Sequence, residues 1–311
     1  MRRRAGLVAT ALLATAGGAG AWSPDAVRML VAYPPGGISD RMARLLAHAL
    51  EAQLGCPVLV ENRPGAGGSV ALQAIARSQP DGRTVGFCAI SPLALSPLLG
   101  VPAPNVAPVI GVMRTPLLLV GTSALAARDF AGMLALARAA PGSLRWATSG
   151  VGTIGHLVLE QVQRMENIEV VHVPYAGGGP QLHDALAGRF ELLSTNLAPQ
   201  QIEYVRSGRF TPLALGAPAR AAALPDVPTF AEAGCPGANR DSLFGLFAAR
   251  ATPAVLVERL NAACAKVLSQ PDFRQVLLAS GNLPAGGSAQ QFRAEIEQQA
   301  AANRRAGVFS R

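Results

Sequence analysis

Apolar and polar residues follow two different periods along the chain, and these periods predict where strands and helices lie. Residues 27–33 and 56–62 are short apolar runs of the length that buried strands have. Between them, apolar residues recur at the three- and four-residue spacing of a helix with one apolar face, which Gly55 ends. These positions are Met42, Leu45, Leu46, Ala49 and Leu50.

The same alternation continues along most of the chain. Further strands are predicted at 83–90, 144–149, 168–175, 189–195 and 210–217. Further helices are predicted at 67–78, 156–165, 179–187, 198–208, 253–269, 271–280 and 288–304. Strands that alternate with helices indicate an α/β fold with mainly parallel sheets. The Pro-rich stretch 100–109 separates two such blocks and therefore suggests two sheets.

Composition and charge limit the classes of partner. Half of the 311 residues are apolar, which is enough for a full core, and only 5% are aromatic, so the core is built mainly of Ala, Leu and Val. The formal charge of +8 raises nucleic acid as a partner. The basic residues form no further run, however, beyond the one at the N-terminus. We therefore expect no nucleic-acid partner.

The N-terminal run has its own explanation. Residues 1–21 combine three arginines, an apolar stretch and closing small residues, which is the arrangement of a cleavable secretory signal. We expect cleavage after Ala21 and a mature protein in the periplasm. An uncleaved anchor is the alternative, and the export route, Sec or twin-arginine, stays open. The apolar stretch 116–127 is too short and too interrupted to be a second membrane span.

The four cysteines carry no metal-binding or redox spacing. Cys56, Cys88, Cys235 and Cys264 form neither a CxxC pair nor a zinc-type pattern. An oxidising compartment permits a disulfide, yet each cysteine lies in an apolar stretch that a core would bury. Both alternatives stay open.

The stretch 33–40, with the sequence YPPGGISD, joins the first strand to the first helix, which the pattern starts at Ser39 or Asp40. Gly36 and Gly37 lack a Cβ, so the backbone can approach a ligand and direct N–H groups at it. The N-terminus of the helix adds partial positive charge, and together these features form an anion site. The alternative is a stiff turn with Ser39 or Asp40 as the N-cap.

Three further glycine-rich loops follow strands and precede helices. They are 61–70 in the first block and 147–157 and 174–182 in the second. Ligands of α/β sheets bind beyond the carboxyl ends of the strands, where such loops lie. Two loops from each block could therefore face each other across a cleft, which is the layout of a binding protein.

These glycine-rich loops and the stretches around them resemble those of a known family. It is similar to the substrate-binding proteins of tripartite tricarboxylate transporters, the Bug/TctC-type periplasmic receptors. The matching stretches run in order from residue 33 to 263 and are YPPGGISDRMAR, LGCPVLVENRPGAGGSVALQAIARSQPDG, ATSGVGTIGHL, VHVPYAGGGPQLHDALAGRFEL, LPDVPTFAEAG and TPAVLVERLNAA.

The resemblance implies a two-lobed periplasmic binding fold that closes on a small ligand, usually a carboxylate. One lobe would comprise 22–121 and 243–311 and the other 122–242, with hinges near Gly121 and Leu243. The implied ligand contacts are Tyr33, Pro35, Gly36, Gly37, Asp40, Ala66, Gly67, Ser149, Gly150, Thr153, Tyr175, Ala176, Gly177 and Thr195. For Tyr175, packing between the lobes is the alternative to ligand contact.

The resemblance also implies partners. The protein would be a monomer that delivers its ligand to integral membrane subunits of the transporter, and a sensor that feeds a signalling system is the alternative. Many relatives have Phe-Asp-Asn where this chain has Ser194, Thr195 and Asn196. The missing aspartate makes the pocket less acidic and disfavours recognition of an amine.

The sequence supports an enzyme less well than a binding protein. Gly150, Gly152 and Gly155 match the G-x-G-x-x-G pattern of dinucleotide-binding folds, but the acidic partner Glu169 begins the next strand instead of ending it. Hydrolase motifs such as G-x-S-x-G and HExxH do not occur in the sequence. The four histidines lack the spacing of a metal site. We expect no catalytic residue, no metal and no cofactor.

Overall fold

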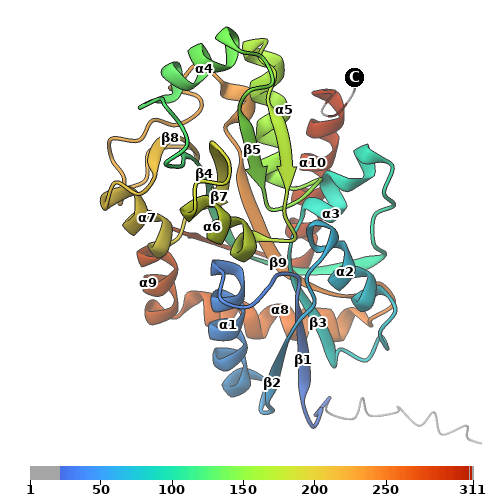
Figure 1. Cartoon of the computed structure of the whole chain (residues 1–311). Coiled ribbons are helices and arrows are strands. Elements are labelled where there is room, and N and C mark those ends of the chain that lie inside the picture. Colours follow the sequence, from blue (N-terminus) through green and yellow to red (C-terminus); the bar gives the residue numbers. More distant parts are fainter. Residues whose placement is uncertain (1–21, 308, 310–311) are drawn as a thin grey trace, which may run out of the picture.

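The computed structural model describes residues 22–307 and residue 309, and it forms two lobes of sheet and helix joined by long central strands (Figure 1). The predicted secretory signal, residues 1–21, lies outside the described residues. Across 22–307, no helix combines the length and the apolar character that a membrane span requires.

The first lobe is a sheet covered by helices on both faces. Its strands are β1 (Val27–Val31), β2 (Val58–Asn62), β3 (Thr84–Ala89) and β10 (Leu283–Gly286). Its helices are α1 (Ile38–Leu54), α2 (Ser69–Ala76), α3 (Ser91–Ala94), α8 (Ala254–Ser269), α9 (Pro271–Ala279) and α10 (Ala289–Arg305), with short 3-10 turns at Ala66–Gly68 and Ser96–Leu99. Helix α1 buries Met42, Leu46 and Leu50 in the core, whereas Leu45 is 42% exposed.

The second lobe has the same design. Its strands are β5 (Arg145–Thr148), β6 (Val171–Pro174), β7 (Leu192–Asn196) and β8 (Thr211–Gly216). Its helices are α4 (Phe130–Ala139), α5 (Ile154–Glu166), α6 (Gly178–Leu186) and α7 (Pro199–Arg206), with a 3-10 turn at Pro236–Ala238. The core of this lobe surrounds the fully buried Trp146.

Two strands, β4 (Val106–Gly121) and β9 (Asp241–Ala249), connect the lobes. Residues 106–116 of β4 pair with β9, and residues 117–121 pair with β7 and β8 of the second lobe. The change of partner between Pro116 and Leu117 carries the chain from one sheet to the other. We keep the predicted division into 22–121 with 243–311 and 122–242 as a proposal for the lobe boundaries.

Both sheets are mixed. Strands β2, β1 and β3 run parallel in the first lobe, as do β6, β5 and β7 in the second, so the predicted parallel strands form the body of each sheet. The connecting strands β4 and β9 pair antiparallel with their neighbours. The four cysteines, Cys56, Cys88, Cys235 and Cys264, are free and buried.

Candidate functional site

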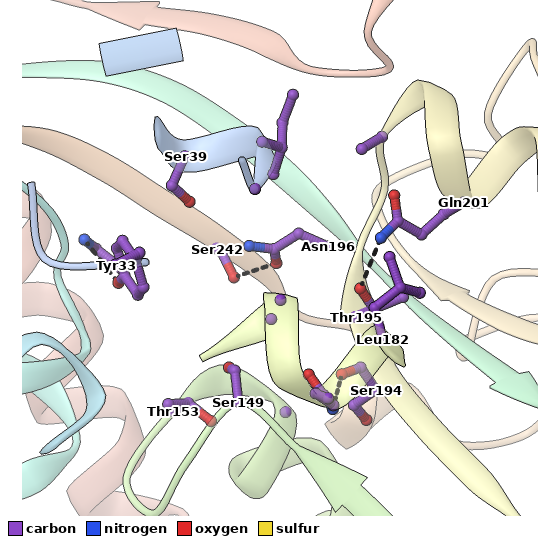
Figure 2. Close-up of a pocket in the computed structure, with 18 of the residues that line it drawn as sticks. Tyr33, Ser39, Ser149, Thr153, Leu182, Ser194, Thr195, Asn196, Gln201 and Ser242 are labelled. Carbon is purple, nitrogen blue, oxygen red and sulfur yellow. Dashed lines mark hydrogen bonds between the residues drawn. The ribbon is translucent and has the colours of Figure 1, made fainter. Parts of the chain in front are cut away.

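A cavity of about 130 Å³ lies where the two lobes meet, and both lobes contribute to its wall. Tyr33 and Ser39 of the first lobe lie on one side of it, and Ser149 and Thr153 of the second lobe lie on another (Figure 2). We call this cavity the interlobe pocket. Among the described residues that line it, Arg41 is the one charged side chain and none is acidic.

The start of α1 forms one wall of the interlobe pocket. Gly37 is the N-cap, with φ −75° and ψ 169°, and no side chain caps the N–H groups that follow it. A Cβ added to Gly37 would meet no atom within 4 Å. Gly36, Gly37, Ile38 and Ser39 all line the pocket, so uncapped backbone donors at a helix N-terminus border it.

Asp40 does not line the pocket, but it binds the backbone of the loop that does. The helix begins at Ile38, so the predicted N-cap role of Ser39 or Asp40 is wrong. The Asp40 carboxylate instead accepts hydrogen bonds from the Gly36 amide (3.0 Å), Arg44 Nε (3.1 Å) and Asn62 Nδ2 (2.7 Å). Burial raises the pKa of Asp40, but the bonds from Arg44, Asn62 and Gly36 outweigh it, so the pKa is lowered.

Tyr33 and Phe244 form an apolar part of the pocket wall. Their rings pack edge to face with centroids 5.7 Å apart, and both residues line the cavity. The Tyr33 hydroxyl accepts a hydrogen bond from the Ala89 amide (3.2 Å). Burial raises the pKa of Tyr33 well above its ordinary value, so the phenol stays neutral.

The opposite wall is the loop before α5. Thr153 is the N-cap of α5; its hydroxyl accepts from the His156 amide and donates to the Gly150 carbonyl (2.7 Å). These two bonds hold the loop that places Ser149 and Thr153 at the pocket. Ser149 and Thr153, two residues of this loop that the sequence analysis selected, therefore both line the pocket.

Side chains from the connecting strand β9 and from β7 and α7 of the second lobe form the base of the pocket. Ser242 Oγ on β9 donates to Asn196 Oδ1 on β7 (3.1 Å), and Gln201 Nε2 lies 3.3 Å from Thr195 Oγ1 (Figure 2). The Ser242–Asn196 bond joins the connecting strand β9 to β7 of the second lobe. The pocket base therefore combines a side chain of a connecting strand with side chains of the second lobe.

Other glycine-rich loop residues lie between the lobes instead of lining the pocket. Gly67 has φ +62°, and a Cβ there would lie 3.1 Å from the Val151 carbonyl oxygen of the opposite lobe. A Cβ on Gly177 would lie 2.7 Å from Pro34 Cδ. These glycines allow the loops to approach each other as closely as they do.

The structure thus separates the predicted site residues into two groups. Those that line the interlobe pocket are Tyr33, Gly36, Gly37, Ser149, Thr153 and Thr195. Those that do not line it are Pro35, Asp40, Ala66, Gly67, Gly150, Tyr175, Ala176 and Gly177. The pocket also contains polar residues that the sequence analysis did not select, namely Arg41, Ser91, Gln181, Ser194, Asn196, Gln200, Gln201 and Ser242.

Tyr175 and the histidine pair lie outside the pocket wall. The Tyr175 hydroxyl donates to Asp184 Oδ2 (2.8 Å), and its ring packs on Phe190. His156 stacks on His172 with ring centroids 4.3 Å apart, and its Nδ1 accepts from the Gly152 amide. Burial and the neighbouring His156 lower the pKa of His172 to about 4, so His172 is neutral at physiological pH.

Known proteins are similar to this chain in sequence and in architecture. Residues 42–307 match the family described as "Tripartite tricarboxylate transporter family receptor". The chain belongs to this family of receptors. Protein BugT of Bordetella pertussis is 33% identical over 93% of this chain and 90% of its own length. A protein encoded in the tcbD-tcbE intergenic region of Pseudomonas sp. strain P51 is 32% identical over 88% of this chain and 83% of its own length.

Solved structures agree with the receptor fold. R. palustris Rpa4515 with adipate superposes with a TM-score of 0.84 at 32% identity, over 91% of this chain and 96% of that one. MatC from Rhodopseudomonas palustris with bound malate superposes with a TM-score of 0.78 at 28% identity, over 89% and 98%. The two-lobed α/β fold predicted from the sequence is confirmed.

Family and fold are those of solute-binding proteins, which are not enzymes, and they imply an extracytoplasmic location.

The glycines of the G-x-G-x-x-G pattern make contacts within the protein. Gly152 contributes an amide to His156, and a Cβ on Gly150 would lie 3.2 Å from the Tyr175 carbonyl oxygen. Within residues 22–307, His, Cys, Asp and Glu side chains do not gather in groups of three that could hold a metal.

Proposed function

We propose that this receptor captures a small carboxylate in the interlobe pocket and delivers it to the integral membrane subunits of a tripartite tricarboxylate transporter. Solute binding follows from the family. The carboxylate is supported by two relatives of the same fold, one solved with adipate and one with malate. The chemistry of the pocket wall supports the same class of ligand.

One observation carries this proposal. The first turns of α1, α6 and α7 all line the interlobe pocket, and no side chain caps any of the three helix starts. A helix N-terminus carries roughly half a positive charge and free N–H donors, so it favours a carboxylate. Since no acidic side chain lines the pocket within the described residues, nothing there opposes the attraction.

Arg41 supports a second negative charge on the ligand. It lines the pocket from α1, one turn after the uncapped amides, and is exposed. The next arginine on this helix, Arg44, is paired with Asp40, whereas Arg41 pairs with no carboxylate among the described residues. A dicarboxylate could therefore place one group at the helix starts and the other near the Arg41 guanidinium.

We also propose where the protein acts and in what form. The mature protein would begin at Trp22 in the periplasm after cleavage of the secretory signal. It would act as a monomer, without metal, cofactor or catalytic residue. N-terminal sequencing of protein from the periplasmic fraction tests this location and the cleavage site. An intact Met1 on cytoplasmic protein would contradict both.

A thermal-shift screen of mono-, di- and tricarboxylates tests the proposed function. A ligand at a hundred times its Kd stabilises the folded protein by about 2.7 kcal/mol. We expect one or more small acids to raise the melting temperature, and NAD to leave it unchanged. A shift with NAD and none with any acid would contradict the proposal.

A further inference from the structure

We infer that the ligand carries a hydroxyl group, which donates a hydrogen bond to Oε1 of Gln181. This inference rests on the proposed function, since it assumes that the interlobe pocket takes a small carboxylate. It adds the chemical class within the acids, namely hydroxy acids, and the residue that recognises it.

The orientation of the Gln181 amide is fixed by its neighbour. Gln181 lies in the first turn of α6, lines the interlobe pocket and is 1% exposed. Its Nε2 donates to the backbone carbonyl oxygen of Ser194 on β7 (2.9 Å). A carbonyl oxygen only accepts hydrogen bonds, so the nitrogen has to occupy this position and Oε1 has to occupy the other.

Ser194 is itself held in place. Its Oγ accepts a hydrogen bond from Nε1 of the buried Trp146 (2.7 Å), and β7 pairs with β4 and β5 on its two sides. Ser194 lies at the pocket beside Thr195 and Leu182 (Figure 2). Gln181 is therefore anchored to a rigid strand, and its free oxygen cannot turn away without losing the bond to that strand.

Oε1 of Gln181 is buried and has no hydrogen-bond partner among the described residues. A buried acceptor without a donor is unfavourable, and such groups are few in native proteins. The ionised carboxylates of a ligand cannot supply the missing donor because they only accept. On the ligand, the groups that can donate to it are a hydroxyl, an amide N–H or an ammonium group.

The pocket favours the hydroxyl over the ammonium group. A buried ammonium needs a counter-charge, and no acidic side chain lines the pocket within the described residues. The helix starts and Arg41 would repel a cation as well. Gln201, whose Oε1 also lacks a partner, does not decide the matter, because its contact Thr195 Oγ1 can donate as well as accept.

Matched acids test the inference. Calorimetric titration would compare succinate, each enantiomer of malate, and aspartate, and the same set built on glutarate, 2-hydroxyglutarate and glutamate. We expect a hydroxy acid to bind about ten- to a hundredfold more tightly than its unsubstituted parent, since the parent leaves the buried acceptor unpaired. In Gln181→Met the ratio of the two affinities should fall towards one.

The ratio of the affinities for hydroxy acid and parent acid distinguishes lost recognition of the hydroxyl group from damage to the fold. A variant that only loosens the lobe would weaken both acids of a pair alike. Gln161→Met makes the same exchange at a buried glutamine on α5 outside the pocket wall, and it should keep the wild-type ratio.

Three results would overturn the inference. The first is equal affinity for hydroxy acid and parent acid, which would mean that a water molecule supplies the donor. The second is a wild-type ratio in Gln181→Met, and the third is a preference for the amino acids. Binding of no carboxylate at all would overturn the proposed function itself, and with it this inference.

Discussion

Asp40 connects the loop at the cleft to the helix that follows it. Its buried carboxylate accepts hydrogen bonds from Gly36, Arg44 and Asn62, so three segments of the first lobe meet on one side chain. The amides around Gly37, which we propose bind the ligand, are held in position by a residue that does not line the pocket.

Asp40→Asn should therefore destabilise the protein by about 2 kcal/mol at pH 7, because charge-assisted hydrogen bonds are lost. The folded-state pKa of Asp40 is lowered from its ordinary value of 3.8. Its contribution to stability is then fully present above that value and disappears as the pH falls through the lowered pKa. Urea unfolding at pH 7 and at acid pH measures both effects.

Asp129→Asn is the matched control. Asp129 is a true N-cap that accepts from the Gly132 amide at the start of α4, and asparagine serves that role well. We expect a change of only a few tenths of a kcal/mol there. Equal losses in both variants, or a difference that persists at the lowest pH, would contradict the role given to Asp40.

At the residue scale, the sequence identified loops better than side chains. The glycine-rich loops were visible because strand, glycine and helix follow one another along the chain. The sequence analysis did not select Gln181 and Asn196 for the pocket wall. Which side of a helix or strand faces a cleft depends on how two lobes are set against each other, and no local pattern records that.

At the scale of elements, the loops from the two lobes meet through glycine. Gly67 lies against Val151 and Thr153 of the opposite lobe, and a Cβ there would come within 3.1 Å of a carbonyl oxygen. Gly67→Ala should weaken carboxylate binding by about tenfold, because the added methyl group opposes the closed arrangement and leaves an open one unhindered. Calorimetric titration measures the loss.

Gly55→Ala is the control for backbone strain. Gly55 ends α1 with φ +74°, close to the +62° of Gly67, but a Cβ on it would meet no atom within 4 Å. Both variants should lose about 1 kcal/mol of stability from the left-handed backbone. Only Gly67→Ala should lose affinity, and an equal loss of affinity in Gly55→Ala would contradict a contact role for Gly67.

Strand β4 is one of the elements that the sequence analysis did not predict. Strand β4 is buried on both faces, so its sequence does not alternate between apolar and polar residues. It also contains Pro108 and Pro116, and the Pro-rich stretch that includes its start was interpreted as a separator of the two sheets. The bulges between Pro108 and Ile110 and between Gly111 and Met113 accommodate the irregular stretch. The amphipathic helices, by contrast, were largely visible from their periodicity.

At the scale of the whole molecule, the C-terminus forms a third connection between the lobes. Helix α10 packs on β4 and α3 of the first lobe, and its end lies beside α5 of the second (Figure 1). There Arg164 Nη1 donates to the Ala306 carbonyl (2.7 Å), and Phe309 stacks on His156 with centroids 4.7 Å apart. Opening of the lobes would strain these contacts.

Phe309→Ala should accordingly shift the lobes towards an open form. The stacking contact is worth about 0.5–1.5 kcal/mol, so carboxylate affinity should fall by roughly two- to tenfold, mainly through faster dissociation. Stopped-flow fluorescence gives the rates. An unchanged dissociation rate would mean that the C-terminal residues follow the second lobe without holding it.

The most direct test of carboxylate binding between the lobes is calorimetric titration of the wild type and of Gly37→Val with the acid that the thermal-shift screen selects. The extended backbone at Gly37 accepts valine, and a Cβ there meets no protein atom, so the variant should fold. Its side chain would stand where the ligand meets the start of α1. The predicted result is binding to the wild type and a loss of at least ten- to a hundredfold in the variant, with similar melting curves. Equal affinity in both proteins would contradict the site.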